Sequence, residues 1–214
     1  MVTNNSPNTF QEQLWRGDFG DAYINRNDPN VEAIAARTQC WAEILRVVAG
    51  APPRSILEVG ANIGLNLRAL SGLCPAALYA VEPNETARKI LVDDSVVTGE
   101  RALDGVASSI ALPDGAVDFA FTSGVLIHIH PDDLLASCRE IHRVSGRYIG
   151  CVEYFSDRPV EIPYREQREA LFKRDFGTFY LENFPDLEVA GYGFFWKRIS
   201  GLDNLTWWVF EKRG

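Results

Sequence analysis

The chain has 214 residues, of which 46% are hydrophobic and 23% charged, and its formal net charge is −8. This length predicts one domain with a sizeable core, and the composition is typical of a soluble globular protein. The acidic balance argues against a general nucleic-acid or membrane-surface binder, because such proteins need a basic face. It leaves room for a local basic patch that binds one small anion.

The cysteines are scattered and form no C-x-x-C pair: Cys40, Cys74, Cys138 and Cys151. This pattern predicts buried thiols in a reducing compartment and neither a metal site nor a disulfide framework. The N-terminus, MVTNNSPNTF, lacks the basic and apolar regions of a signal peptide. No apolar run approaches the roughly 18 residues of a membrane span. We therefore expect a cytoplasmic protein without a membrane segment.

The N-terminal part contains signals for two helices. Thr9 and Glu12 have capping-box spacing, so a short helix is expected to begin there. The glycine-rich segment 17–29 indicates a turn. Asp28 followed by proline resembles a helix cap and first turn, and the apolar spacing beyond it predicts an amphipathic helix over 30–49.

Strand and helix patterns alternate after that. Apolar runs predict strands at 55–60, 78–82, 102–107, 116–124 and 147–155, and helices at 63–73, 84–95 and 131–144. This alternation predicts an α/β, Rossmann-like, mostly parallel sheet with helices on both faces. Strand-like runs at 187–198 and 205–213 are joined by only a few residues, which permits a hairpin but no crossover helix. We therefore expect the sheet to end in an antiparallel C-terminal hairpin.

Three predicted strand ends carry the residues that suggest chemistry. In the first, SILEVGANIG, Glu58 lies inside an apolar run that Gly60 and Gly64 close. A buried strand that ends in a glycine turn and opens into a helix cradles nucleotides. Glu82 ends the second strand, where an acid can accept hydrogen bonds from both ribose hydroxyls. The third end, TSGVLIH at 122–128, is a sharp turn.

A nicotinamide-dependent oxidoreductase is one alternative for such a site. It would normally carry G-x-G-x-x-G, whereas this chain reads G-A-N-I-G with Asn62 at the middle glycine. It would also avoid Glu58 close to a pyrophosphate. The acid instead favours a cofactor that carries cationic groups.

With these motifs, the chain resembles the class I S-adenosylmethionine (SAM)-dependent methyltransferases over about residues 50–155 and the C-terminal hairpin. The segments WRGDFGDAYINRN, TSGVLIHIHPDDL and EIHRVSGRYIGCVEYF are similar to the methylases associated with pseudaminic acid biosynthesis. Small-metabolite O-methyltransferases that act on phosphonates look like relatives of that group. The resemblance implies O-methylation of a small anionic metabolite, such as a phosphonate or a sugar acid, in natural product biosynthesis. A non-catalytic SAM-binding regulatory module is the alternative.

The resemblance also implies contacts with SAM. Glu58 would lie near the ammonium group, Glu82 would hold the ribose hydroxyls and Pro83 would lie against the adenine. Family members often carry an acid just before Ala107, where this chain has valine, so we expect Ser108 to meet the adenine edge instead. Arg26 either pairs with the cofactor carboxylate or is a surface arginine. The full set of expected cofactor-binding residues is Arg26, Glu58, Gly60, Asn62, Gly64, Glu82, Pro83, Ala107, Ser108, Thr122 and Val125.

Methyl transfer requires a nucleophile at near-attack distance and the exclusion of water, with no covalent nucleophile on the enzyme. An ionised carboxylate or phosphonate needs no base, whereas a sugar hydroxyl would benefit from one. His128, after the fourth-strand turn, is the candidate base. A structural or pocket-lining role is the alternative for this histidine.

The acceptor site is expected in the N-terminal segment and in residues 156–186, because loops on a rigid sheet carry specificity. The segment 158–174 gathers arginines and a lysine near tyrosines, which suits a carboxylate, phosphate or phosphonate. The alternative is a solvated helix face with charge pairs. The candidate substrate-binding residues are Tyr23, Tyr154, Tyr164, Arg165, Lys173 and Arg174.

One domain, 1–214, is therefore expected, with a small anionic metabolite as partner and no nucleic acid, membrane or metal. Its expected parts are an N-terminal lid and helix (1–49), a cofactor-binding core (50–155), a substrate-side insertion with one or two helices (156–186) and the C-terminal hairpin (187–214). The sequence predicts no oligomeric state.

Overall fold

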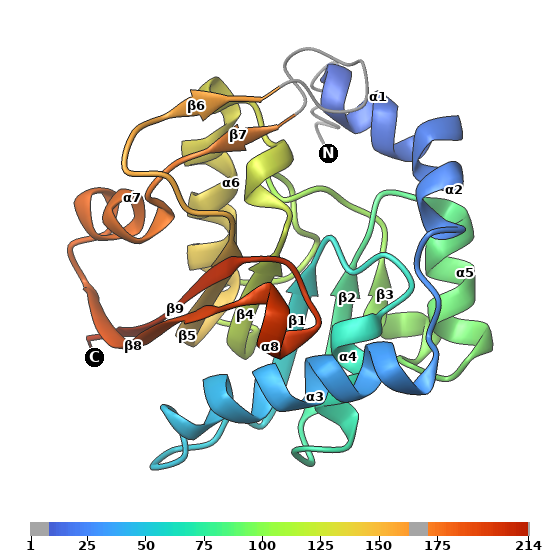
Figure 1. Ribbon diagram of the computed structural model, residues 1–214, viewed down its shortest axis with the longest axis horizontal. Helices are drawn as coiled ribbons and strands as arrows, with labels where there is room; N and C mark the ends of the chain where they lie inside the picture. The colour runs from blue at the N-terminus through green and yellow to red at the C-terminus, as the bar shows by residue number, and fades with distance from the viewer. Residues whose placement is uncertain (1–8, 163–170, 214) are drawn as a thin grey trace.

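The structure, a computed structural model, describes residues 9–162 and 171–213. Its centre is a seven-stranded sheet with the order β3-β2-β1-β4-β5-β9-β8 (Figure 1). The strands are β1 (Ser55–Val59), β2 (Ala77–Val81), β3 (Ala102–Leu103), β4 (Val117–Ser123), β5 (Ser145–Glu153), β8 (Leu187–Phe195) and β9 (Leu205–Lys212). Strands β1, β2, β3, β4 and β5 run parallel, and β9 pairs antiparallel with both β5 and β8. The predicted Rossmann-like sheet with an antiparallel C-terminal hairpin is confirmed.

Helices cover both faces of this sheet (Figure 1). They are α1 (Phe10–Arg16), α2 (Asp18–Ile24), α3 (Val31–Arg46), α4 (Leu65–Ser71), α5 (Glu85–Asp93), α6 (Pro131–Val144), α7 (Phe176–Asn183) and α8 (Lys197–Ser200), with 3-10 turns η1 (Gly99–Arg101) and η2 (Leu126–His128). Side chains alternate between the faces along each strand. In β9, Trp207 packs with α3 and α4, whereas its neighbour Trp208 packs with α6 and α7.

The order of the strands locates the ligand-binding edge of the sheet. The chain adds β2 and β3 on one side of β1 and then returns to add β4 on the other side. The carboxyl ends of β1 and β4 therefore border a switch point in strand order, where open α/β sheets bind ligands.

The N-terminal helices agree with the sequence in part. The Thr9 side chain accepts the Glu12 backbone N–H at 3.2 Å, which confirms the predicted helix start, and the Glu12 carboxylate accepts from Arg16 Nε. The turn predicted over 17–29 is wrong, because Asp18–Ile24 forms helix α2. Its glycine serves close packing: a Cβ at Gly20 would lie 2.0 Å from the carbonyl oxygen of Trp15.

The cap of α3 is also a correction. The helix begins two residues later than Asp28 suggested, and Asn30 caps it by accepting the Ala33 N–H at 2.8 Å. Asp28 supports this cap, because its carboxylate accepts from the Asn30 side chain at 3.2 Å. An asparagine cap satisfies the same free helix N–H groups that an aspartate would.

The region 156–186 holds α7 and a small separate sheet of β6 (Val160–Glu161) and β7 (Phe172–Lys173). The predicted strand 102–107 shortens to β3, and the connection between β8 and β9 contains the single helical turn α8. Cys40, Cys138 and Cys151 are buried as predicted, and Cys74 is half-buried. Within the described residues, no helix combines the length and apolar character that a membrane crossing requires.

Packing within the sheet gives a test of the core. Gly150 of β5 faces Phe119 and Phe121, and a Cβ there would lie 2.8 Å from the Phe119 ring and 2.9 Å from the Phe121 Cβ. Both phenylalanines are fully buried, so they have little room to move. We expect Gly150→Ala to lower the free energy of unfolding by about 1–3 kcal/mol.

Urea denaturation with unchanged m-value measures this effect. Gly50→Ala is the matched control, because a Cβ at Gly50 meets nothing within 4 Å. Equal stability of the two variants would contradict the packing described for β5.

Candidate functional site

A cavity of about 490 Å³ opens at the carboxyl ends of β1, β2, β4 and β5, which is within the size range of small-molecule sites. Its walls come from the turns after these strands, from α1 and α2, from α3 and from the connection between β8 and β9. The predicted site residues that line it are Tyr23, Arg26, Glu58, Gly60, Asn62, Glu82, Pro83, Ala107, Ser108, Val125, His128 and Tyr154.

The turn after β1 needs glycine for two reasons. Gly60 has φ +77°, and a Cβ there would lie 2.6 Å from the Val125 side chain, so the turns after β1 and β4 can approach only without it. Gly64 has φ +76° and caps α4. It faces Leu91 and Val96 rather than the cavity, so it shapes the turn from behind and does not line the site.

Glu58 brings a buried, half-satisfied carboxylate to the cavity. It is 2% exposed, and its Oε1 accepts from Asn66 Nδ2 at 2.6 Å. Its Oε2 is buried and makes no well-formed hydrogen bond among the described residues, although the Leu67 backbone N–H interacts with this carboxyl and helps to lower its pKa. Burial raises the pKa of Glu58 to about 8, against the lowering effect of Asn66 and of the positive charge of Arg37. The free oxygen is suited to a ligand that donates hydrogen bonds and carries positive charge.

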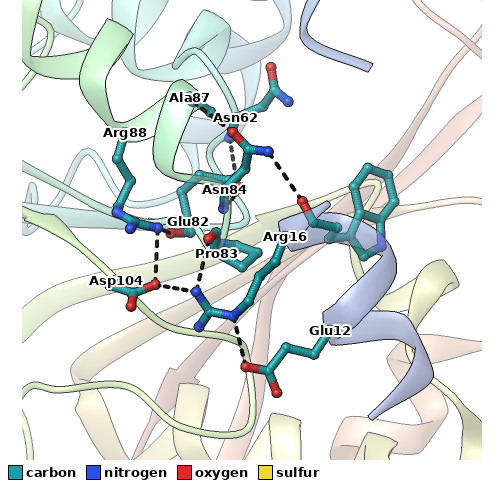
Figure 2. A network of polar contacts seen from close by, with 10 residues as sticks. Glu12, Arg16, Asn62, Glu82, Pro83, Asn84, Ala87, Arg88 and Asp104 are labelled. Atoms are coloured by element: carbon teal, nitrogen blue, oxygen red, sulfur yellow. Dashed lines mark hydrogen bonds and ion pairs between the residues drawn. The ribbon is translucent and has the colours of Figure 1, made fainter. Parts of the chain in front are cut away.

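Glu82 holds two turns together (Figure 2). Its Oε2 accepts the Asn62 N–H at 2.7 Å, and its Oε1 accepts the Asn84 N–H at 2.9 Å. Burial raises the pKa of this carboxyl, and the two backbone N–H groups oppose the rise. A carboxylate oxygen accepts more than one hydrogen bond, so both oxygens can still receive hydroxyl donors from the cavity.

Arg37 of α3 is a cavity residue that the sequence analysis missed. Burial lowers the pKa of its guanidinium, and the neighbouring Glu58 opposes this. Its one described hydrogen bond, to the Ala33 carbonyl at 3.1 Å, leaves most of its five donors available for a ligand. A signal existed in the sequence, since Arg37 shares a helical stripe with the apolar residues Ile34 and Trp41.

The predicted Arg26 also lines the cavity but is exposed. Its guanidinium lies over the rings of Phe19 and Tyr23, at 6.0 and 5.8 Å from their centroids. Arg26 therefore stands at the rim, whereas Arg37 stands beside the buried acid.

The other end of the cavity is aromatic. His128 of η2 lies edge-on to Trp15 of α1, with 5.2 Å between ring centroids. Tyr154 donates its hydroxyl to Asp203 Oδ2 at 2.5 Å, and hydrogen bonds from Lys197 and Tyr154 lower the pKa of Asp203. His130 follows His128 by two residues and lines the same wall, and tertiary packing brings Trp15 and Asp203 there from distant segments that the sequence analysis did not assign to the site.

A buried acid fixes the turn that carries His128. Glu153 at the end of β5 is fully buried, and its Oε1 accepts the N–H groups of Val125 and Leu126, both at 3.1 Å. Burial raises the pKa of Glu153 to about 7. The turn after β4 is therefore attached to the neighbouring strand.

Some predicted residues lie away from the cavity walls. Thr122 is fully buried in β4 behind them. Lys173 lies behind Tyr154, with its Nζ 4.7 Å from the ring centroid, and Arg174 lies over Phe179 at 5.0 Å. Tyr164 and Arg165 lie outside the described residues.

Comparison with known proteins agrees with this geometry. A family model described as a methyltransferase domain matches residues 57–149, which contain both acids and the turn after β4. No curated protein sequence matches the chain significantly.

Solved structures match almost the whole chain at low identity. The Burkholderia thailandensis 1,6-didemethyltoxoflavin-N1-methyltransferase, with its substrate and S-adenosylhomocysteine (SAH) bound, has a TM-score of 0.71 at 17% identity and covers 100% of this chain and 94% of its own. A SAM-dependent methyltransferase of Leishmania major has a TM-score of 0.72 at 16% identity and covers 94% and 86%. Magnesium protoporphyrin IX methyltransferase of Synechocystis with bound SAM has a TM-score of 0.66 at 12% identity and covers 99% and 100%.

At these identities the likeness establishes the fold. The matching domain and these solved structures of the same fold are methyltransferases, and two of the structures hold SAH or SAM.

Proposed function

We propose that this protein transfers a methyl group from SAM to an oxygen atom of a small anionic metabolite in a biosynthetic pathway. The observation that carries the cofactor is the buried Glu58 Oε2, which makes no well-formed hydrogen bond among the described residues and stands beside the available guanidinium of Arg37. The methionine end of SAM is a zwitterion. Its ammonium fits the free carboxylate oxygen, and its carboxylate fits the arginine.

The remaining cofactor residues follow the strand ends. Glu82 would accept the ribose hydroxyls with the lone pairs that its two backbone contacts leave open. Pro83, Ala107 and Ser108 line the part of the cavity beyond Glu82 and would border the adenine. Arg26 at the rim is the second candidate for the cofactor carboxylate.

When bound, SAM supplies a methyl group on a sulfonium sulfur. The chain's own task is to orient the acceptor and exclude water, which Trp15 of α1 and the turn after β4 would do. His128 would orient an acceptor hydroxyl and take its proton, whereas an ionised acceptor oxygen would need only orientation.

The acceptor wall supports an acid that also carries hydroxyls, such as a sugar acid, and a phosphonate is the second class to test. Lys173 behind Tyr154 would attract the acid group, and Asp203 offers an acceptor for a hydroxyl. Asp133 also lines this wall, so the described acceptor end is of mixed charge. Lys173, Arg174, Tyr164 and Arg165 remain candidates for the acid group.

Binding and turnover test the proposal together. Calorimetry should detect binding of SAH and no binding of NAD. When the protein is incubated with SAM and a panel of sugar acids, phosphonates and matched amines, the oxygen acceptors should cause release of SAH. Binding of SAH without turnover on any acceptor would favour a regulatory SAM-binding module. Turnover on amines alone would overturn the choice of oxygen.

Removing the proposed ribose acid should weaken the cofactor strongly. Glu82→Ala deletes the acceptor for the ribose hydroxyls, and one buried hydrogen bond contributes about 1–3 kcal/mol, so SAH affinity should fall by about 10- to 100-fold. Glu85→Ala, an exposed acid in the same helix–turn region, is the control and should bind normally. An unchanged dissociation constant for Glu82→Ala would refute the ribose assignment.

Binding of SAH should release a proton from the Glu58 carboxyl. With a pKa of about 8, its carboxyl is mostly protonated at about pH 7, and an arriving ammonium favours the ionised form. SAH binding at about pH 7 should therefore release close to one proton, visible as a binding enthalpy that depends on the buffer. The affinity should rise with pH up to about 8. Glu58→Gln should abolish proton release, and its persistence in this variant would assign it to another group.

The KM of an acidic acceptor should depend on the charge of Lys173. Lys173→Ala removes the ammonium beside the Tyr154 ring, so the KM of an acidic acceptor should rise by about two- to fivefold, the size of a partly screened charge attraction, while SAH affinity stays unchanged. Lys89→Ala on the exposed face of α5 is the charge-matched control. Equal kinetics of the two variants would remove Lys173 from the acceptor site.

A further inference from the structure

Helices α1 and α2 lie across the ends of four parallel strands. Asn27, just after α2, donates to Asn62 beyond β1 at 3.4 Å. Asn84 beyond β2 contacts α2, Asp104 beyond β3 pairs with α1, and His128 beyond β4 contacts α1. This pair of helices therefore covers the proposed cofactor from ribose to methionine.

Helix α1 has little apolar attachment. None of its residues is buried, although Trp15 lines the cavity and meets His128. Apolar burial is the main force that fixes a helix on a domain. Polar contacts must therefore hold α1 in place.

Arg16 makes most of these polar contacts (Figure 2). Its Nη1 donates to the Pro83 carbonyl at 3.0 Å and to Asp104 at 2.7 Å. Its Nε donates to Glu12 one turn earlier at 2.9 Å, which fixes the direction of the guanidinium. The side chain is 30% exposed, so water screens these contacts only in part.

The partners of Arg16 belong to the turn that presents Glu82. Arg88 donates to the Glu82 carbonyl at 2.7 Å and shares Asp104 with Arg16, at 3.0 Å. Asn84, whose N–H binds the Glu82 carboxylate, donates its side-chain amide to Asp21 at 2.9 Å and to the Trp15 carbonyl at 3.4 Å. One short segment thus carries the proposed ribose acid and the attachment of α1 and α2.

We propose that Arg16 is a positioning residue that fastens α1 and α2 over the occupied cofactor, sets Trp15 against His128 and so limits the rate of cofactor exchange. The proposal rests on the proposed function, because SAH is the ligand whose exchange it describes. Arg16 itself touches neither reacting group. It acts through the helix that it attaches.

Arg16→Ala should loosen the helix pair without removing any cofactor contact. Backbone amides of residues 10–24 should exchange hydrogen about fivefold faster than in the original protein, the size that a partly exposed ion-pair network supplies. Stopped-flow fluorescence should show SAH dissociating about fivefold faster, with association also faster, because an opened cover admits ligand as well as releasing it.

Two variants separate this role from a general loss of stability. Arg143→Ala is the matched control: Arg143 is also 30% exposed, pairs with Glu140 in its own helix and with Asp114, and donates to the Leu112 carbonyl, but it does not line the cavity. It should leave SAH kinetics and the exchange of 10–24 unchanged. Arg16→Lys keeps the charge but cannot make all three contacts, so it should restore part of the effect.

The ligand-free measurement separates failure of this proposal from failure of the proposed function. If the original protein binds no SAH, the proposed function fails, and exchange of 10–24 in the free variants still reports what Arg16 attaches. If SAH binds and Arg16→Ala matches Arg143→Ala in both exchange and SAH kinetics, Arg16 is not the fastening residue. Faster exchange with unchanged SAH kinetics would also overturn the claim that this attachment limits cofactor exchange.

Discussion

The buried carboxylate of Glu82 is the contact on which the rest of the site depends. By accepting the N–H groups of Asn62 and Asn84, it joins the glycine turn after β1 to the start of α5. Two backbone turns that would otherwise need separate anchors are thereby fixed relative to each other, and the carbonyl of Pro83 is directed toward Arg16. The shape of the cavity floor and the attachment of its cover both follow from one side chain.

Keeping two acids at this edge has an electrostatic cost. Burial raises the pKa values of Glu58 and Glu82, and the negative charge of Glu82 raises that of Glu58 further. Nearby guanidiniums offset the cost in part, from Arg37 beside Glu58 and from Arg88 beside Glu82. A cationic ligand would complete the balance. The ammonium group of the proposed cofactor would supply this charge, which would make an acid compatible with a nucleotide-type turn here.

The sequence predicted what local pattern controls. An apolar run closed by glycine or an acid marks the end of a strand. This pattern predicts the parallel strands correctly and places Glu58 and Glu82 at the ends of the first two. Tertiary packing overrode the pattern elsewhere: Gly20 looked like part of a turn but allows α2 to pack on Trp15. Arg37 was visible only as a charge on an apolar helix face. Asp203 was not visible at all, since its neighbour Tyr154 is distant in sequence.

This difference explains why the sequence says more about the proposed methyl donor than about the methyl acceptor. Most residues proposed for SAM lie on turns of the parallel core within the segment that matches the methyltransferase model, and Arg26 and Arg37 come from the N-terminal part. Much of the acceptor wall comes from α1, from the region before α7 and from the connection between β8 and β9, outside that segment, whereas His128, His130 and Asp133 lie inside it. Such appended segments can change while the core is kept. A shared fold at 12–17% identity therefore bears on the core that carries the proposed donor site, and the proposed acceptor must be inferred from this chain's own Tyr154, Lys173 and Asp203.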